Sequence, residues 1–147
     1  MNGPRIVIMQ LSSPRQVTQW QDHCRSALGG DAAASTSQLP DNRVVWQLSS
    51  ANHRALARSV RVYATVDDAL AEMQDTRDRF GQFKARSLKV STRSEYAWVA
   101  SIGDDKRLMS ARAYSTVRDT RDAIVSTTEL FLSASVVHRA RTLAAAG

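Results

Sequence analysis

The chain has 147 residues, 43% of them apolar and 23% charged, a composition typical of a folded globular protein and not of a disordered tail. Lys and Arg outnumber Asp and Glu by 20 to 14, so the formal net charge is +6 and polyanions should be attracted at low salt. The single cysteine, Cys24, excludes an intramolecular disulfide and favours a reducing, cytoplasmic location. The longest early apolar run, residues 6–9, is too short for a membrane span, so no membrane partner is expected.

Near the amino terminus, the pattern predicts a strand and then a helix. Residues 5–10 form the strand candidate, and Ser13 with Gln16 has the spacing of a capping box. Pro14 occupies the favoured first helical position. An apolar stripe at helical spacing follows and ends at two glycines: Val17, Trp20, Cys24 and Leu28, then Gly29 and Gly30. Residues 31–42 are mostly small or polar and predict a linker.

Residues 44–80 and residues 96–131 align with each other, which predicts an internal repeat. Trp46 and Leu56 recur 52 positions later as Trp98 and Leu108. Eight further identities recur at a spacing of 51 positions: Ser59, Arg61, Tyr63, Thr65, Val66, Asp68, Thr76 and Phe80 match Ser110, Arg112, Tyr114, Thr116, Val117, Asp119, Thr127 and Phe131. Chance would give about one or two identities over such a length, so we predict two related units.

Each unit is predicted to contain two strands, a turn between them and a helix. The strands are expected at 43–49, 55–63, 95–101 and 107–114, with turns at 50–54 and 102–106. Residues 83–92 alternate in character and predict one more strand before the second unit. Both helices should begin at a Thr followed three positions later by Asp, namely Thr65 with Asp68 and Thr116 with Asp119.

These elements predict an α+β protein with an antiparallel sheet and the helices packed on one face. Two tandem strand–turn–strand–helix repeats would build it, together with an amino-terminal strand–helix unit. Four segments are expected to form one compact domain: residues 1–42 with the amino-terminal unit and linker, 43–82 and 83–132 with the two repeats, and 133–147 with a helical tail.

The second unit resembles the YegP-like repeat, a short bacterial and archaeal domain of unknown function that often occurs in tandem. The resemblance rests on an aromatic strand, a turn and a second strand that ends in Ser and Tyr: Trp98, Gly103, Ser110 and Tyr114, with Trp46, Asn52, Ser59 and Tyr63 in the first unit. Both turns depart from the family's Asn-Gly dipeptide, since His53 follows Asn52 and Gly103 precedes Asp104. The resemblance implies a sheet with helices on one face, and brings no activity, cofactor or catalytic residue.

The sequence offers no catalytic or metal-binding constellation. His23, His53 and His138 show no metal-ligand spacing, and Cys24 falls in the apolar stripe of its helix, as a core residue would. A helix start explains Asp67 and Asp68, and a turn explains Asp104 and Asp105. We therefore expect no enzyme, no cofactor and no metal.

The second strand of each unit carries the candidate binding residues. Alternation along a strand places Ser59, Arg61 and Tyr63 on one face, and Ser110, Arg112 and Tyr114 on the corresponding face of the second unit. If helices cover the opposite face, which carries Val and Ala, these six residues form an open sheet face. The tyrosines can instead close the corner between strand and helix, with the arginines in solvent. Trp46 and Trp98 are expected in the core.

Two functions fit such a protein. The first is a non-catalytic interaction module that binds a protein partner, or a second copy of itself, through its sheet, because Tyr and Arg are favoured anchors of protein interfaces. The alternative is a nucleic-acid-binding protein that uses the Arg/Tyr face for single strands or RNA. Acidic residues interrupt the basic ones along both helices, as in Arg77-Asp78-Arg79, which weakens the alternative.

Overall fold

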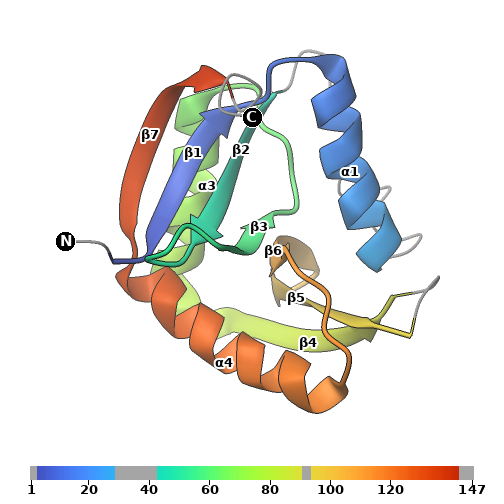
Figure 1. The fold of residues 1–147 in the computed structure, drawn as a ribbon. Helices are drawn as coiled ribbons and strands as arrows, with labels where there is room; N and C mark the ends of the chain where they lie inside the picture. Colours follow the sequence, from blue (N-terminus) through green and yellow to red (C-terminus); the bar gives the residue numbers. More distant parts are fainter. Residues whose placement is uncertain (1–2, 29–42, 91–93, 143–147) are drawn as a thin grey trace.

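The computed structural model describes residues 3–28, 43–90 and 94–142 and has the α+β class predicted from the sequence (Figure 1). The helices are α1 (Pro14–Leu28), α3 (Val66–Asp78) and α4 (Val117–Ser133), and a short 3-10 turn, η1 (Phe80–Gln82), precedes β4. The strands are β1 (Arg5–Gln10), β2 (Val44–Ser49), β3 (Ala55–Ser59), β4 (Phe83–Lys89), β5 (Tyr96–Ile102), β6 (Asp105–Ser110) and β7 (Ser135–Thr142). The predicted linker at 31–42 and the glycine helix end at 29–30 lie outside the described residues.

All seven strands form one sheet in the order β4-β5-β6-β3-β2-β1-β7. The prediction of a purely antiparallel sheet is wrong at one edge, where β7 runs parallel to β1 and pairs Ile6 with Val136. The helical tail predicted at 133–147 is wrong over residues 135–142, because α4 ends at Ser133 and the extended backbone at Ala134 leads into β7; residues 143–147 lie outside the described residues. Val136 and Val137 are β-branched and favour a strand, and β7 covers an edge of β1 that would otherwise be open.

The helices lie on both faces of the sheet, so the predicted one-sided packing is wrong. One core contains Trp46, Trp98 and Leu108 with residues of α3 and α4, whereas Val45, Val99 and Met109 belong to a second core with residues of α1. Figure 1 shows α3 behind β1 and β2, with α1 on the opposite side. Because neighbouring residues of the central strands are apolar, both faces need cover, and α1 provides it on the second face.

The predicted core residues are confirmed. Trp46, Trp98 and Cys24 are fully buried. The Trp46 ring stacks on Phe131 of α4 with 5.7 Å between centroids, and Phe131 in turn lies 6.4 Å from Phe83 of β4. Offset aromatic pairs of this kind add to the free energy that burial of apolar area already contributes.

All three predicted helix starts are confirmed. Thr65 and Thr116 have extended backbone angles, and each hydroxyl accepts a hydrogen bond of 3.0 Å from the backbone N–H of the Asp three positions later. Ser13 Oγ accepts a bond of 3.3 Å from Gln16 N–H. Among the described residues, no helix is long and apolar enough to cross a membrane.

The centre of the sheet joins the two predicted units. β3 and β6 pair antiparallel, with Ala57 opposite Ser110, Arg58 opposite Met109 and Ser59 opposite Leu108. β1–β2–β3 and β4–β5–β6 therefore extend from the same central pair in opposite directions. This order makes β4 the terminal strand of the half that contains α4.

Candidate functional site

The two predicted binding serines are buried and hold the strands together. Ser59 Oγ accepts a hydrogen bond of 3.3 Å from Trp46 N–H, and Ser110 Oγ accepts one of 3.1 Å from Trp98 N–H. Both serines are 0% exposed. They terminate β3 and β6, so the alternation on which the open face was predicted stops there, and Val60 and Val62 turn inward under α1.

The two predicted binding tyrosines close the corners between strand and helix. Tyr63 and Val44 exchange backbone hydrogen bonds of 2.6 and 2.9 Å, and Tyr114 and Tyr96 exchange bonds of 2.8 and 2.7 Å. Tyr63 is 7% exposed, and burial raises its pKa well above the usual value. Burial also raises the pKa of Tyr114, which is half-buried. The backbone hydrogen bonds of these two tyrosines therefore stabilise the fold.

The predicted arginines have different surroundings. Arg61 pairs with Glu72 of α3 at 3.3 Å and with Asp105 of β6, whereas Arg112 is exposed on the segment after β6. The six predicted residues therefore do not form one open face. Because Arg61 is already paired with two carboxylates, it has less charge to offer a nucleic acid than the sequence suggested.

Arg61 belongs to an ion cluster that the sequence did not predict. At its centre is Arg107, whose side chain is 8% exposed and donates to Asp105 at 2.7 Å, to Asp75 at 2.9 Å and to Thr76 Oγ1 at 3.1 Å. The hydrogen bond from Arg107 is the main cause that lowers the pKa of Asp75. Burial raises the pKa of Glu72, because its effect on the carboxyl group is larger than the opposite effect of the nearby arginines. The cluster ties β6 to α3, and its charges balance once Arg79, which pairs with Asp75 at 3.4 Å, is included.

No group of three His, Cys, Asp or Glu side chains in the described segments could hold a metal ion. His23 contacts the Ser110 carbonyl at 3.2 Å, His53 contacts Arg5 at 2.9 Å, and the side chain of His138 lies outside the described residues. Asp105 pairs with arginines, as described above. The remaining candidates for a site are therefore surfaces.

The outer side of β4 is one of the two edges of the sheet, the other being that of β7. Within the described chain, β4 pairs with β5 alone and ends the sheet. Val90 N–H donates to the Glu95 carbonyl at 2.9 Å, on the β5 side. Because backbone groups alternate sides along a regular strand, the N–H and C=O groups of Ala85, Ser87 and Lys89 face outward. They form a row to which another strand can hydrogen-bond.

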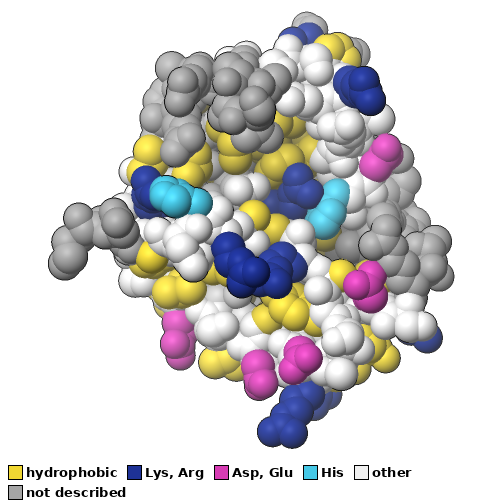
Figure 2. All heavy atoms as spheres, in the orientation of Figure 1, with side chains coloured by type: hydrophobic (Ala, Val, Ile, Leu, Met, Phe, Trp, Pro, Cys, Tyr) yellow, Lys and Arg dark blue, Asp and Glu magenta, His cyan; other side chains and the backbone are white. Residues whose placement is uncertain are grey.

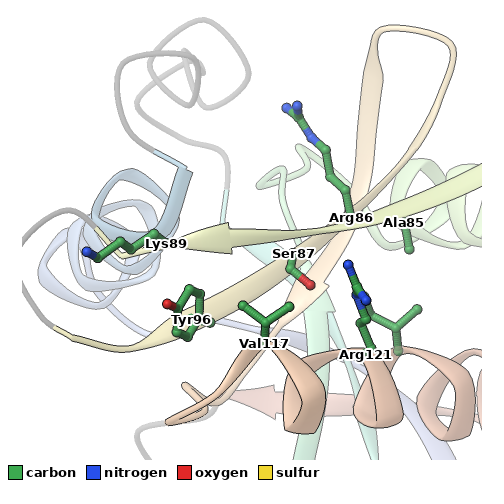
Figure 3. A pocket seen from close by; sticks show the side chains of 8 residues that line it. Ala85, Arg86, Ser87, Lys89, Tyr96, Val117 and Arg121 are labelled. Atoms are coloured by element: carbon green, nitrogen blue, oxygen red, sulfur yellow. The ribbon is translucent and has the colours of Figure 1, made fainter.

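A pocket flanks this edge on each face of the sheet. The first, of about 490 Å³, lies on the side of α4 and is lined by Ala85, Arg86, Ser87, Lys89, Tyr96, Val117, Arg121 and Ile124. In Figure 3, Arg121 extends from α4 towards Ser87, while Arg86 points to the other side of β4. The second, of about 670 Å³, is lined by Lys84, Ala85, Arg86, Ser101, Gly103, Asp104 and Lys106. Side chains of an added strand would alternate between these two pockets.

The edge is strongly basic. Five cations line the two pockets against one carboxylate, Asp104: Lys84, Arg86, Lys89, Lys106 and Arg121. All three lysines of the chain are among them. A strand was predicted at 83–92, but a sequence does not show the order of strands in a sheet and so does not identify this strand as an edge. Two of the three lysines, Lys84 and Lys89, lie within that strand, and this was the signal available in the sequence.

No family model matches the chain, and no curated protein matches it by sequence. One solved structure is similar: the solution NMR structure of yegP from E. coli, a protein of unknown function. The similarity has a TM-score of 0.53 at 14% identity, over 74% of this chain and 90% of that chain. At this identity the similarity shows the fold alone. The chain thus has a YegP-like fold, which confirms at the level of the fold the resemblance predicted from the sequence.

Proposed function

We propose that this YegP-like fold is a non-catalytic interaction module that binds an extended, acidic segment of a protein partner along the free edge of β4. The observation that carries the proposal is the outward row of backbone groups at Ala85, Ser87 and Lys89. Addition of a strand to such an edge provides main-chain hydrogen bonds, and flanking pockets provide selectivity. The buried thiol of Cys24 fits a reducing compartment, and we propose the cytoplasm.

The charge of the edge specifies the partner. A strand seated on β4 would place alternate side chains near Arg121 and Lys89 on one face, and near Lys84 and Lys106 on the other. Acidic side chains on both faces of the added strand would meet cations. Lysines on an edge strand also discourage association between copies of a protein. That effect argues against a homodimer through this edge, since two β4 strands would bring like charges together.

A peptide titration tests the proposal. The probe is a capped peptide of about nine residues of Val and Glu, with Glu on both faces of the extended chain, a length that matches a typical strand. Hydrogen exchange should slow at the amides of Ala85, Ser87 and Lys89, whose N–H groups face outward. The amide of Arg86, which faces β5, should change little. Unchanged exchange at all three outward amides at saturating peptide would overturn the proposal.

Variants separate the backbone and charge contributions. Ser87→Pro removes one outward N–H without removing a bond to β5, and prolines are tolerated on edge strands. It should weaken peptide binding about tenfold while the melting temperature changes little. Arg86→Glu with Lys89→Glu should weaken it further, whereas Arg15→Glu, an exposed cation on α1, is the matched control.

Two comparisons define the competing outcomes. A peptide with Lys in place of Glu should not bind. A single-stranded oligonucleotide that binds more tightly than the acidic peptide, with an affinity unaffected by Ser87→Pro, would favour the nucleic-acid alternative.

Light scattering at about 50 and 500 mM salt should give a monomer at both salt concentrations. A salt-resistant dimer would contradict the argument from like charges.

A further inference from the structure

A further pocket, on the other side of the sheet from α3 and α4, contains an arginine that pairs with no carboxylate of the described residues. The pocket has a volume of about 320 Å³ and lies between α1 and β3, lined by Leu11, Gln16, Gln19, Trp20, His23 and Arg58. Figure 2 shows Lys, Arg and His side chains gathered across the middle of one face, with Asp and Glu side chains mostly towards its rim. A cavity of this size suits a small ligand.

Arg58 differs from the arginines of the ion cluster. Its guanidinium carbon lies 3.5 Å from the centroid of the Trp20 ring, and its Nε is buried without a hydrogen-bond partner. No carboxylate of the described residues pairs with it, whereas Arg61 and Arg107 each have at least two. Burial lowers the pKa of Arg58 to about 10, so it stays charged at neutral pH. A desolvated cation without an anion is costly, and an anion from outside would offset that cost.

The position of Arg58 is fixed before any ligand arrives. Trp20 Nε1 donates a hydrogen bond of 3.0 Å to the Ser59 carbonyl, which holds the indole against β3. The guanidinium stacks on this ring, so little side-chain freedom remains to be lost on binding.

Neighbouring side chains add donors to the same pocket. Gln16 Oε1 accepts two hydrogen bonds of 2.7 Å from Ser12, which leaves the amide NH2 of Gln16 as a donor. His23 Nε2 donates to the Ser110 carbonyl at 3.2 Å, so Nδ1 of the neutral ring is a hydrogen-bond acceptor and adds no donor. The pocket therefore combines one cation with several polar groups and one apolar wall, Leu11.

We propose that this pocket binds a small organic anion through its carboxylate or phosphate group, with Arg58 as the counter-charge and Gln16 as a supporting donor. Arginine matches both oxyanions with paired N–H groups. The proposal is independent of the edge of β4, since the two sites share no residue and lie on different elements.

An NMR titration of the intact protein tests the site, with the Trp20 indole N–H as reporter. The probes are inorganic phosphate, acetate and chloride, added at constant ionic strength. Phosphate or acetate should give a saturable shift of the Trp20 signal, and the comparison between them tells which oxyanion is preferred. Equal, non-saturating responses to all three salts would overturn the proposal.

Arg58→Gln keeps most of the side-chain length but removes the charge, and it should weaken binding of the preferred anion at least about tenfold. Arg15→Gln on the exposed side of α1 should bind as the unmodified protein does. If Arg58→Gln fails to fold, Gln19→Leu removes an exposed donor of the pocket and should weaken binding a few-fold. Unchanged affinity in whichever of these two pocket variants folds would refute the site.

Discussion

Arg107 provides a strong test of the energetics of this fold, because one side chain satisfies a cluster of carboxylates. Arg107→Met keeps an apolar stem of similar length and removes every N–H donor. Asp75 and Asp105 are 44% and 31% exposed, so water replaces much of what they lose. Glu72 is only 13% exposed, lies 3.7 Å from Arg107 and would keep Arg61 as its nearby cation. The charge left without this partner in a buried place is then that of Glu72, and loss of a partner from such a group costs about 3 kcal/mol, near the lower end for buried pairs.

The cost should be visible as a fall in melting temperature of about 6–12 °C at pH 7. It should shrink as the pH falls towards about 4, because burial already raises the pKa of Glu72 and removal of Arg107 raises it further. Arg79→Met is the matched control, since Arg79 also pairs with Asp75, but at 3.4 Å and in an exposed position. It should change the melting temperature by no more than about 1 °C. Equal effects of the two variants, or a loss in Arg107→Met that is independent of pH, would refute the reasoning.

Two further predictions concern histidines. His53 has a positive φ of 65°, where a side chain is unfavourable, so His53→Gly should raise the free energy of unfolding by about 1 kcal/mol in urea titrations, and a decrease would mean that the contact with Arg5 dominates. Burial, and secondly the charge of Arg58, lower the pKa of His23, so the folded state should lose stability as the pH falls from about 6.5 through this lowered pKa. His23→Gln should flatten that slope between about pH 7 and pH 5, and an unchanged slope would assign it to other groups.

Local signals predicted the local structure well. Thr65 and Thr116 start their helices because a hydroxyl and an acid three positions later satisfy backbone N–H groups, and neither needs a distant partner. Trp46 and Trp98 are buried because large apolar side chains on strands inside the sheet pack into the core, away from water. The strand at β4 and the amino-terminal strand and helix were also predictable from periodicity. All of these features depend on short stretches of sequence.

The functional surfaces depend on information that short stretches do not carry. Alternation predicted an open face that includes Ser59 and Ser110, but β3 and β6 end at these residues, and each hydroxyl accepts a hydrogen bond from the backbone N–H of a tryptophan on the next strand. Arg58 and Arg61 are three positions apart, and only the tertiary contacts decide that one pairs with carboxylates while the other stacks on Trp20. Sequence alone could not distinguish them.

β1 and β4 hold corresponding places in the two halves of the sheet, but only β1 has a further strand beside it, and the chemistry of the two strands explains why. β1 carries four consecutive buried apolar residues, and its outer edge is closed by β7 of the same chain. An unpaired apolar strand of this kind would promote association between copies. β4 carries Lys84, Arg86 and Lys89, so it can stay unpaired in water without attracting another β4. The same charges that keep this edge from pairing with itself would favour an acidic strand over any other, which makes the edge selective and not merely protected.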